Sequence, residues 1–256
     1  MNNNYVAGID IGSRSIELVV LNGTRPVHQV KAPTTFDPLR QCERLMQEVN
    51  ARHFVATGYG RKLFADTVKG LNVTTITEIQ AYAVGARHLF PDARTVLDIG
   101  GQDTKVIALM TNGKVAKFEM NDRCAAGTGK FLEFMSTALQ IPLESFGEFA
   151  MSSDKRIQIS NMCTVFAESE ATSLMARGES AENIAMGLHL AIVQRTLSML
   201  RRIGAEHPLL FAGGVAHNRC VRKLLGEQLE RQVIVPENPD MVGALGAALF
   251  GRNMAG

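Results

Sequence analysis

The sequence lacks an excess of charge of either sign, a long apolar run and any Cys-x-x-Cys pair. Its 27 Lys and Arg residues against 25 Asp and Glu give a net charge of +2, which argues against a nucleic-acid surface. No apolar run reaches the roughly 18 residues that cross a bilayer. Without a Cys-x-x-Cys pair, a self-contained zinc ribbon and a thioredoxin motif are both disfavoured. Because Asn residues at positions 2–4 lead directly into a predicted strand, we expect no signal peptide and a cytoplasmic protein, with neither nucleic acid nor membrane as a partner.

Two common nucleotide-binding motifs are also missing. No Gly-x-Gly-x-x-Gly follows the first predicted strand, so a Rossmann dinucleotide site is disfavoured. Residues 126–131 resemble a Walker loop, but Cys124 stands where its first Gly is required and Phe131 replaces the Ser or Thr. A nucleotide site in this chain must therefore be of another type.

Two stretches 88 residues apart share one design. Residues 9–21 and 97–109 each contain an apolar strand that ends at Asp-Ile-Gly, a short turn, and a second apolar strand. Such a turn presents backbone N–H groups to a phosphate, with a carboxylate close enough to hold a metal. The repeat predicts two similar half-domains with a nucleotide between them. The residues predicted to form the two phosphate turns are Asp10, Gly12, Ser13, Arg14 and Ser15 in the first, and Asp98, Gly100, Gly101, Gln102 and Asp103 in the second.

A third element follows at residues 210–218, where an apolar strand breaks at Gly213 and Gly214 before a helix. A Gly pair at such a turn lets the backbone approach a flat ligand such as adenine, so we expect Val215 and Asn218 to contact the nucleotide as well. Periodicity and Gly or Pro punctuation predict a mixed α/β fold. The predicted strands lie near 5–11, 15–21, 26–32, 53–57, 73–77, 94–99, 104–110, 114–119, 208–212 and 232–235, and the helices near 38–50, from 61, 78–89, 128–140, 164–177, 180–203, 217–231 and from 240.

Two of the four cysteines, Cys124 and Cys163, stand just before predicted helices, where the helix dipole stabilises a thiolate. A four-iron cluster usually needs four thiolates. A C2 homodimer that brings together Cys124 and Cys163 of both subunits would supply them, and a zinc site of the same composition is the inorganic alternative. Cys42 and Cys220 are interpreted as packing residues.

The order of these segments resembles the actin, sugar-kinase and heat-shock-chaperone ATPase superfamily. The resemblance implies a duplicated actin-like (ribonuclease H-like) fold with two half-domains around a nucleotide cleft. Residues 1–86 would form the first, with a C-terminal helix at about 240–256 packing back, and residues 87–239 the second. It also implies that Asp10 and Asp98 approach Mg²⁺, and that Glu78 or Gln102 orients the attacking water. Gly127 and Gly129, with Lys130, either line the nucleotide or let the helix after Cys124 pivot.

Three longer motifs resemble a narrower family, the activator components of 2-hydroxyacyl-CoA dehydratases and the related ATP-hydrolysing subunits of benzoyl-CoA reductases. They are Asp-Ile-Gly-Gly-Gln-Asp-x-Lys at 98–105, Asn-Asp-x-Cys-Ala-Ala-Gly-Thr-Gly-x-Phe at 121–131 and Met-Cys-x-Val-Phe-Ala-Glu-Ser-Glu at 162–170. The resemblance implies a homodimer with one bridging 4Fe–4S cluster, held by Cys124 and Cys163 of each chain. ATP hydrolysis would drive one low-potential electron, received from a ferredoxin or flavodoxin, to a dehydratase-like or reductase-like iron–sulfur partner.

Two other functions stay open at the level of sequence. A small-molecule kinase of the same superfamily would use the same phosphate turns and keep its cysteines for structure, although residues 24–60 show no obvious insertion that would build a substrate pocket. A nucleotide-gated assembly module like actin would also bind ATP without a metal cluster.

Overall fold

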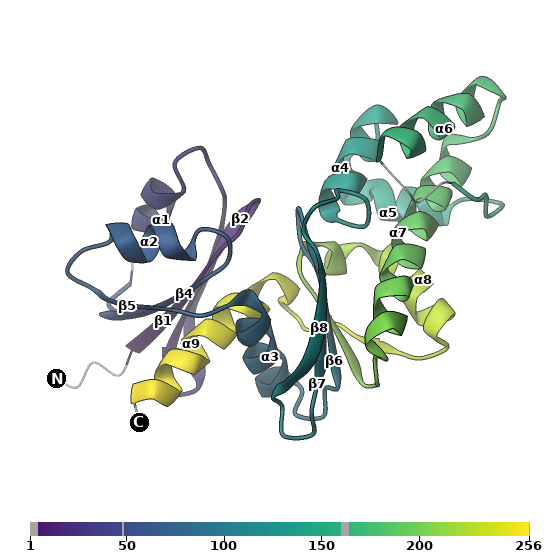
Figure 1. Cartoon of the computed structure of the whole chain (residues 1–256). Coiled ribbons are helices and arrows are strands. Elements are labelled where there is room, and N and C mark those ends of the chain that lie inside the picture. Colours follow the sequence, from purple (N-terminus) through teal and green to yellow (C-terminus); the bar gives the residue numbers. More distant parts are fainter. Residues whose placement is uncertain (1–4, 48, 160–163, 256) are drawn as a thin grey trace.

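The computed structural model of the protein describes residues 5–47, 49–159 and 164–255. Two five-stranded mixed sheets form two lobes that stand side by side (Figure 1). In the described chain no helix is both long enough and apolar enough to cross a membrane. The first sheet contains β1 (Tyr5–Ile11), β2 (Ser15–Asn22), β3 (Arg25–Pro33), β4 (His53–Thr57) and β5 (Asn72–Thr75), and the second contains β6 (Thr95–Ile99), β7 (Thr104–Leu109), β8 (Val115–Asn121), β9 (Leu209–Ala212) and β10 (Val233–Ile234).

The two sheets have the same topology. Their strand orders are β3-β2-β1-β4-β5 and β8-β7-β6-β9-β10. In each, the first three strands pair antiparallel, and the other two join the first strand in parallel. The central strand β1 is buried from Val6 to Ile11, whereas β3 at the edge alternates between exposed and covered residues, because only one of its faces meets the core.

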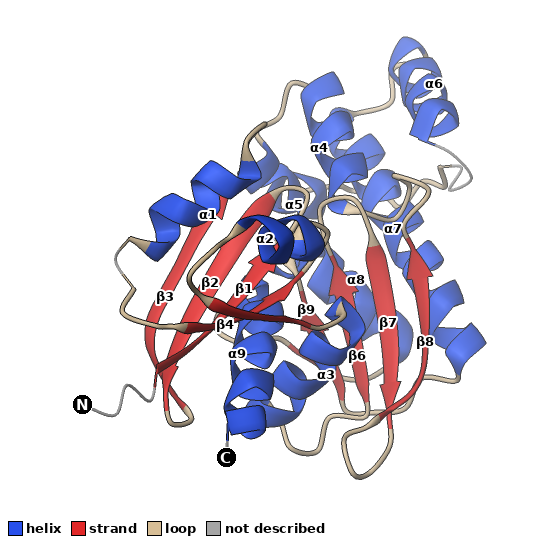
Figure 2. Cartoon of the chain, turned by 60° about the vertical axis from the view of Figure 1, so that its left-hand side comes forward, coloured by secondary structure: helices blue, strands red, loops and turns tan. Residues whose placement is uncertain are grey.

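Helices pack against both sheets (Figure 2). Their starts follow local capping chemistry: the Asp37 carboxylate accepts from the Arg40 N–H at the start of α1, and Thr77 and Gln80 form a capping box at the start of α3. Gly204 ends α7 in the left-handed conformation. The helices are α1 (Pro38–Met46), α2 (Arg61–Thr67), α3 (Glu78–Leu89), α4 (Gly129–Ala138), α5 (Leu143–Met151), α6 (Thr164–Ala176), α7 (Ala181–Ile203), α8 (Arg219–Leu229) and α9 (Val242–Ala255), with 3₁₀ turns η1 (Gly214–His217) and η2 (Pro239–Met241).

The helices α3 and α9 pack against each other between the two sheets (Figure 2). Their contact depends on Gly246, because a Cβ there would lie only 1.8 Å from the Ala81 carbonyl oxygen. The C-terminal helix α9 also covers β1 and β4, so the end of the chain returns to the first lobe. This packing connects the two lobes through a pair of closely fitted helices.

The sequence predictions place most elements within a few residues of their observed bounds, with two corrections. The first helix ends at Met46 rather than near residue 50, and the helix α5 was not predicted at all. Residues 143–151 are short for a helix and carry Gly147 in their middle, which lowers helix propensity. Tertiary packing stabilises α5 nevertheless, because Phe146 and Ala150 are fully buried in the core of the second lobe.

Candidate functional site

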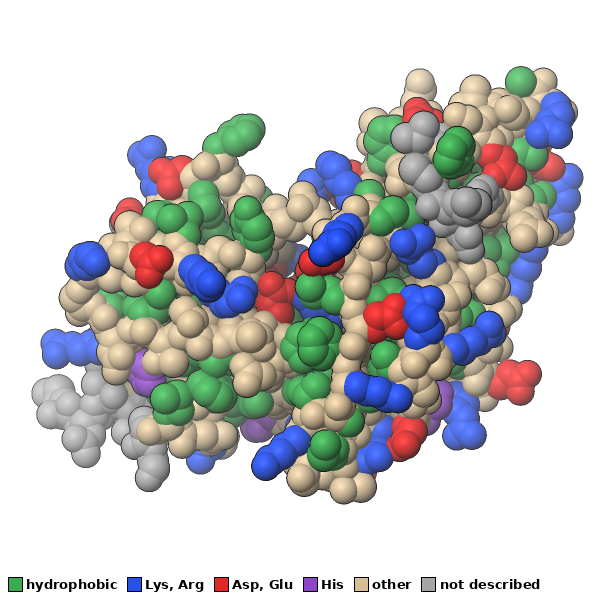
Figure 3. Space-filling model, in the orientation of Figure 1, with side chains coloured by type: hydrophobic (Ala, Val, Ile, Leu, Met, Phe, Trp, Pro, Cys, Tyr) green, Lys and Arg blue, Asp and Glu red, His purple; other side chains and the backbone are tan. Residues whose placement is uncertain are grey.

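A cleft of about 1030 Å³ lies between the two lobes, where Figure 3 shows the molecule hollowed. The structure brings nearly all the predicted nucleotide and catalytic residues to its walls. They are Asp10, Gly12, Ser13, Arg14, Ser15, Glu78, Asp98, Gly100, Gly101, Gln102, Asp103, Gly129, Gly213, Gly214, Val215 and Asn218. Segments from both halves of the chain therefore face one cavity.

The first turn is closed by a hydrogen bond from the Gly12 N–H to the Ser15 carbonyl oxygen, 3.0 Å long. The Thr34 hydroxyl donates to the Gly12 carbonyl oxygen at 2.8 Å, which fixes this turn to the end of β3. The second turn repeats the closure, with the Gly100 N–H donating to the Asp103 carbonyl oxygen at 2.9 Å. Both turns at the cleft wall are thus closed by a backbone hydrogen bond of the same kind.

The second turn is also bonded to the start of α4. The Gly129 N–H donates to the Gly100 carbonyl oxygen at 2.9 Å, and the Lys130 N–H donates to the Gly101 carbonyl oxygen at 2.8 Å. The Lys130 ammonium lies 3.3 Å from the Glu133 carboxylate. Neither Lys130 nor Gly127 lines the cleft. The start of α4 is therefore hydrogen-bonded to the second turn, while Gly127 and Lys130 contribute no surface to the cavity itself.

Gly127 lies instead against α7. Its φ of +88° is in the region that favours glycine, and a Cβ there would lie 2.7 Å from Cδ of Arg195. The Gly127 carbonyl oxygen accepts a 2.6 Å hydrogen bond from the Thr104 hydroxyl. This residue joins the loop after Cys124 to β7.

The predicted adenine segment reaches the cleft through Gly213, which follows β9. Its φ is +81°, and a Cβ there would lie 2.2 Å from Oδ1 of Asp98, so only glycine fits between this loop and the second turn. The Asn218 side chain has a structural role: Oδ1 accepts from the Val221 N–H at the start of α8, and Nδ2 bonds to Nε2 of His189.

A buried lysine that sequence reasoning missed lies at the centre of the second-lobe wall. The Lys105 ammonium lies 2.7 Å from Glu78, 2.7 Å from Asp103 and 3.1 Å from Asp98. Burial lowers the pKa of Lys105, but the three carboxylates outweigh this and raise it well above the usual range. Glu78, a candidate for orienting the attacking water, is therefore held in an ion pair, while Gln102 is exposed at the cleft wall.

The Asp98 carboxylate is only half satisfied. Burial raises its pKa to about 6, although the neighbouring Lys105 opposes that shift. The Oδ2 atom pairs with Lys105, whereas Oδ1 is buried without a hydrogen-bond partner among the described residues. A buried oxygen that lacks a partner fits a magnesium ion or a water bound to it, since Mg²⁺ prefers carboxylate oxygens and keeps several waters.

The first-lobe wall carries two buried carboxylates, Asp10 and Glu17. Burial raises the pKa of Asp10 well above its usual range, and repulsion by Glu17 adds to the shift. Burial likewise raises the pKa of Glu17 to about 7. Next to Asp10 in the sheet, the hydroxyl of Thr57 is buried without a described partner. The environment of this wall therefore favours a bound cation or proton.

Two sets of ion pairs cross between the lobes at the cleft. Arg14 of the first turn lies 2.9 Å from Glu133 of α4. Lys31 of β3 lies 2.9 Å from Asp240 of η2, whose other oxygen lies 2.6 Å from Nε2 of His217. The cleft is thus bridged on both sides of the phosphate turns by charged side chains.

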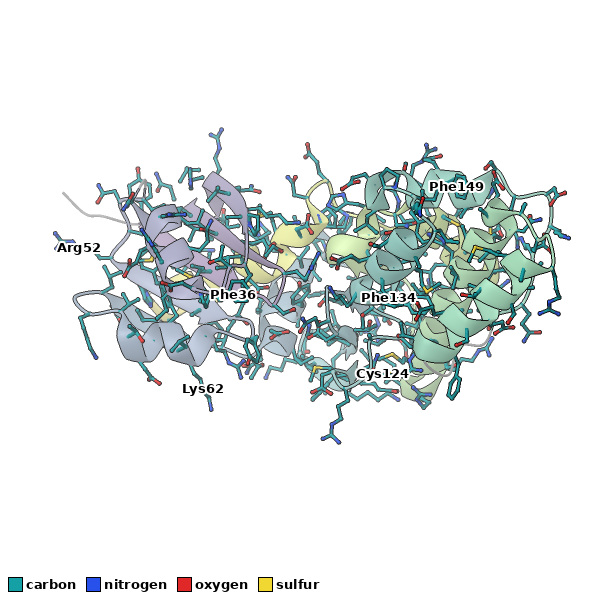
Figure 4. All side chains as sticks on the ribbon, turned by 90° about the horizontal axis from the view of Figure 1, so that it is seen from above. Phe36, Arg52, Lys62, Cys124, Phe134 and Phe149 are labelled. Atoms are coloured by element: carbon teal, nitrogen blue, oxygen red, sulfur yellow. The ribbon has the colours of Figure 1, made fainter. Side chains whose placement is uncertain are left out.

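Cys42, Cys124 and Cys220 do not line the cleft. Cys124 stands in a half-buried turn five residues before α4, so it is not at the first turn of that helix, and Figure 4 shows it at the outer edge of the second lobe. The Asn121 amide holds this turn by donating to the Cys124 and Ala126 carbonyl oxygens at 2.9 and 3.0 Å. Cys163 lies outside the described residues.

The other two cysteines, Cys42 and Cys220, are fully buried, and burial raises the pKa of each thiol to about 12. They are therefore protonated packing residues, as predicted. Among the described side chains, no group of three or more His, Cys, Asp or Glu is arranged to hold a metal ion.

Comparison with known proteins identifies the family. The chain is 36% identical to the 2-hydroxyisocaproyl-CoA dehydratase activator of Clostridioides difficile, over 96% of this chain and 94% of that protein. It is 39% identical to the activator of lactoyl-CoA dehydratase of Anaerotignum propionicum, over 98% of both. The solved structure of the Clostridium difficile activator with bound ADPNP matches with a TM-score of 0.88 at 35% identity, covering 98% of this chain and 95% of that one.

These matches confirm the predicted α/β fold with two lobes of the actin-like ATPase type. The family model of the BadF/BadG/BcrA/BcrD ATPases matches residues 7–251, nearly the whole chain. The chain belongs to the BadF/BadG/BcrA/BcrD ATPase family.

Proposed function

We propose that this protein is an ATP-hydrolysing iron–sulfur activator that passes a low-potential electron to a 2-hydroxyacyl-CoA dehydratase-type or related reductase partner. The observation that carries the proposal is the pair of hydrogen bonds from Gly129 and Lys130 to the second phosphate turn. They tie the nucleotide wall to the helix that follows Cys124. A change at the turn is therefore passed directly to the segment that carries a predicted cluster ligand.

In this proposal the cleft binds ATP with Mg²⁺. The amides of the two glycine turns face the phosphates, the Gly213–Val215 segment faces the adenosine, and Asp10 and Asp98 hold the magnesium or its waters. The unpaired Oδ1 of Asp98 supports this assignment. Gln102, exposed at the wall, and Glu78, once released from Lys105, are the residues proposed to orient the hydrolytic water.

Nucleotide binding would close two half-domains, residues 1–86 with about 240–256, and residues 87–239. The free energy that drives closure cannot exceed the difference between the free energies with which ATP binds the closed state and the open state. The pairs Arg14–Glu133 and Glu78–Lys105 support the division, because each joins one half-domain to the other and such a movement would rearrange it.

The residues proposed to hold the 4Fe–4S cluster are Cys124 and Cys163 of each chain in a homodimer, with one bridging cluster. Cys124 fits because it is only half-buried, whereas the thiols of Cys42 and Cys220 are buried and protonated. When bound, such a cluster supplies a one-electron carrier.

The relatives' names support a dehydratase-like partner, or one like benzoyl-CoA reductase. Two of those proteins are named as activators of dehydratases, and a third, from Thauera aromatica, is named as part of benzoyl-CoA reductase. A ferredoxin or flavodoxin is the proposed electron donor, and the cytoplasm the proposed location.

Anaerobic purification tests the proposal. The protein should be a brown dimer with about four irons per dimer, and Cys124→Ser should remove the iron and the colour. Cys42→Ala is the matched control, since it removes a buried thiol and should keep both. Stoichiometric zinc without iron after anaerobic reconstitution would contradict the cluster, and ATP-dependent phosphorylation of a small molecule by iron-free protein would favour a kinase instead.

A further inference from the structure

One arginine of the first phosphate turn is bound to the opposite lobe. The Arg14 carbonyl oxygen accepts a 2.9 Å hydrogen bond from the Thr34 N–H, which holds its backbone at the end of β3, and its side chain lines the cleft. The guanidinium lies 2.9 Å from Oε2 of Glu133 in α4, a helix of the second lobe. The Arg14 side chain therefore spans the space between the lobes.

The aliphatic part of Arg14 lies directly on the second phosphate turn. A Cβ at Gly101 would lie 2.0 Å from Cγ of Arg14 and 2.9 Å from its Cβ, so any side chain at Gly101 would displace the arginine. The proposed nucleotide site places the phosphates between the two turns. A bound phosphate chain would therefore contact the Arg14 side chain.

Arg14 can give up its pairing with Glu133 at little cost. The two side chains are 45% and 28% exposed, and an ion pair with that much solvent around it contributes little to stability. Glu133 also keeps a second cation, because the Lys130 ammonium lies 3.3 Å from the same Oε2 atom and does not line the cleft. The departure of Arg14 would therefore leave no carboxylate unpaired.

A terminal phosphate is a stronger partner for this guanidinium than Glu133. It carries more negative charge than one carboxylate, and Coulomb attraction rises in proportion to that charge. Its oxygens can also accept two parallel hydrogen bonds from one guanidinium. The balance between the two partners therefore favours the phosphate once a nucleotide is bound.

We propose that Arg14 distinguishes a nucleoside triphosphate from a diphosphate by exchanging Glu133 for the terminal phosphate, an inference that rests on the proposed nucleotide site. The adenosine segment and the second turn both belong to the second lobe, so the part of the nucleotide nearest to a first-lobe residue is the far end of its phosphate chain. A diphosphate lacks that end and leaves Arg14 with Glu133. A triphosphate thus releases α4, the helix that follows Cys124, from its ion pair with the first lobe.

The test measures the Kd of ADP and of the non-hydrolysable triphosphate ADPNP by titration calorimetry, both with excess Mg²⁺. The readout is the ratio of the two Kd values, which expresses the preference for the triphosphate. The proteins compared are the native chain, Arg14→Gln, Glu133→Gln and the double variant. The control is Glu148→Gln, which removes a carboxylate from another ion pair that lines the cleft, that with Arg219.

Arg14→Gln should lower the preference for ADPNP by about tenfold, because it removes a charged hydrogen-bond donor from the terminal phosphate alone. Glu133→Gln should raise the preference by about two- to fivefold, since the arginine no longer leaves a carboxylate to reach the phosphate. In the double variant, Glu133→Gln should add nothing to the effect of Arg14→Gln, because it acts through that arginine. Glu148→Gln should leave the preference as in the native protein.

An unchanged preference in Arg14→Gln would overturn the inference. So would a rise in preference from Glu133→Gln that persists in the double variant or is matched by Glu148→Gln, since it would then come from the general loss of negative charge at the cleft. A failure of the native protein to bind either nucleotide would instead contradict the proposed nucleotide site, so the two proposals fail in different ways.

Discussion

The two lobes repeat one backbone design but differ in the chemistry they carry. Each central strand carries an aspartate one residue before its end, and a glycine with a positive φ follows the next parallel strand, Gly58 at +85° and Gly213 at +81°. In both cases a Cβ on that glycine would lie within 2.5 Å of an oxygen of the aspartate carboxylate. The repeat therefore preserves the close approach of a loop to a carboxylate.

The differences are at matched positions within this shared frame. Opposite the aspartate stands Glu17 in the first lobe and Lys105 in the second. Two residues before the aspartate stands Gly8 in the first lobe and Val96 in the second. The second lobe places a lysine directly opposite its aspartate, whereas the first lobe places a glutamate there and has its lysine, Lys31, one strand further across the sheet. A duplicated fold thus fixes where functional residues lie, and separate substitutions decide their charge.

Gly8→Val should have the largest effect, because it gives the first lobe the residue of the second. A Cβ at Gly8 would lie 2.0 Å from the Ala244 carbonyl oxygen, so α9 could not stay packed on β1. We expect a loss of at least about 3 kcal/mol in unfolding free energy, read as a fall in melting temperature.

Gly226→Val is the matched control, since the nearest atom to a Cβ there is 3.6 Å away. It should change the free energy of unfolding by less than about 1 kcal/mol, because valine has a slightly higher helix propensity than glycine and its Cβ meets no close atom. A melting temperature of Gly8→Val equal to that of the native protein would contradict the close packing of α9 on β1 at this residue.

Substitutions opposite the two aspartates should have effects of opposite sign. Lys105→Met leaves Asp98, Glu78 and Asp103 without their shared cation and should cost about 3 to 5 kcal/mol. Glu17→Gln removes a charge whose burial is unfavourable, so at pH 8 it should raise the melting temperature by a few degrees. Thermal melts of the two variants at one pH compare them, and a loss of stability in both would show that Glu17 is compensated after all.

Acid should weaken the second lobe through His189. Its Nδ1 donates to the Ala185 carbonyl oxygen, Nε2 accepts from Asn218, and burial lowers its pKa from 6.5 to about 4. The unfolded chain therefore takes up a proton before the folded one. The stability that the neutral ring contributes is complete above pH 6.5 and is lost as the pH falls through 4, by roughly 3 kcal/mol in all.

Hydrogen exchange measured at pH 7.5 and at pH 5.0 should show this loss of stability in α7 and α8 sooner than in β1. The reason is that the first-lobe histidines, His28 and His53, are only half-buried. His189→Gln should flatten the pH dependence, and the exposed His88→Gln should not. An equal loss in both lobes, or none in α7, would contradict the assignment.

Contacts between the lobes should matter least for stability. Arg14 and Glu133 are 45% and 28% exposed in their side chains, so solvent screens their pairing. Glu133→Gln should change the melting temperature by less than the equivalent of about 1 kcal/mol. A larger loss would mean that the contact between the lobes depends on this pair rather than on the α3–α9 packing.

Much of the fold could be predicted because it depends on local pattern. Apolar strands broken by Asp-Ile-Gly, capping residues such as Thr77 and the left-handed Gly204 act within a few residues of themselves. The helix α5 was missed because its stability comes from Phe146 in a core built by distant segments. Its local sequence carries a weaker helix signal.

The charged partners of the site were also missed, although part of the signal was present. Glu17 and Lys105 each stand seven residues after the aspartate they face, which a tight hairpin places directly opposite it. Lys31 and Asp240 had no such signal, since they lie more than 200 residues apart and meet only when the lobes assemble.

The sequence alone determined the two glycine turns and the aspartate near the end of each central strand, because these follow from local hydrogen bonding and side-chain periodicity. Tertiary structure alone decided which charges from distant segments meet. Lys105 pairs with Glu78 of α3 and Lys31 pairs with Asp240 of η2, because pairing in a low-dielectric cleft depends on segments that are distant in the chain.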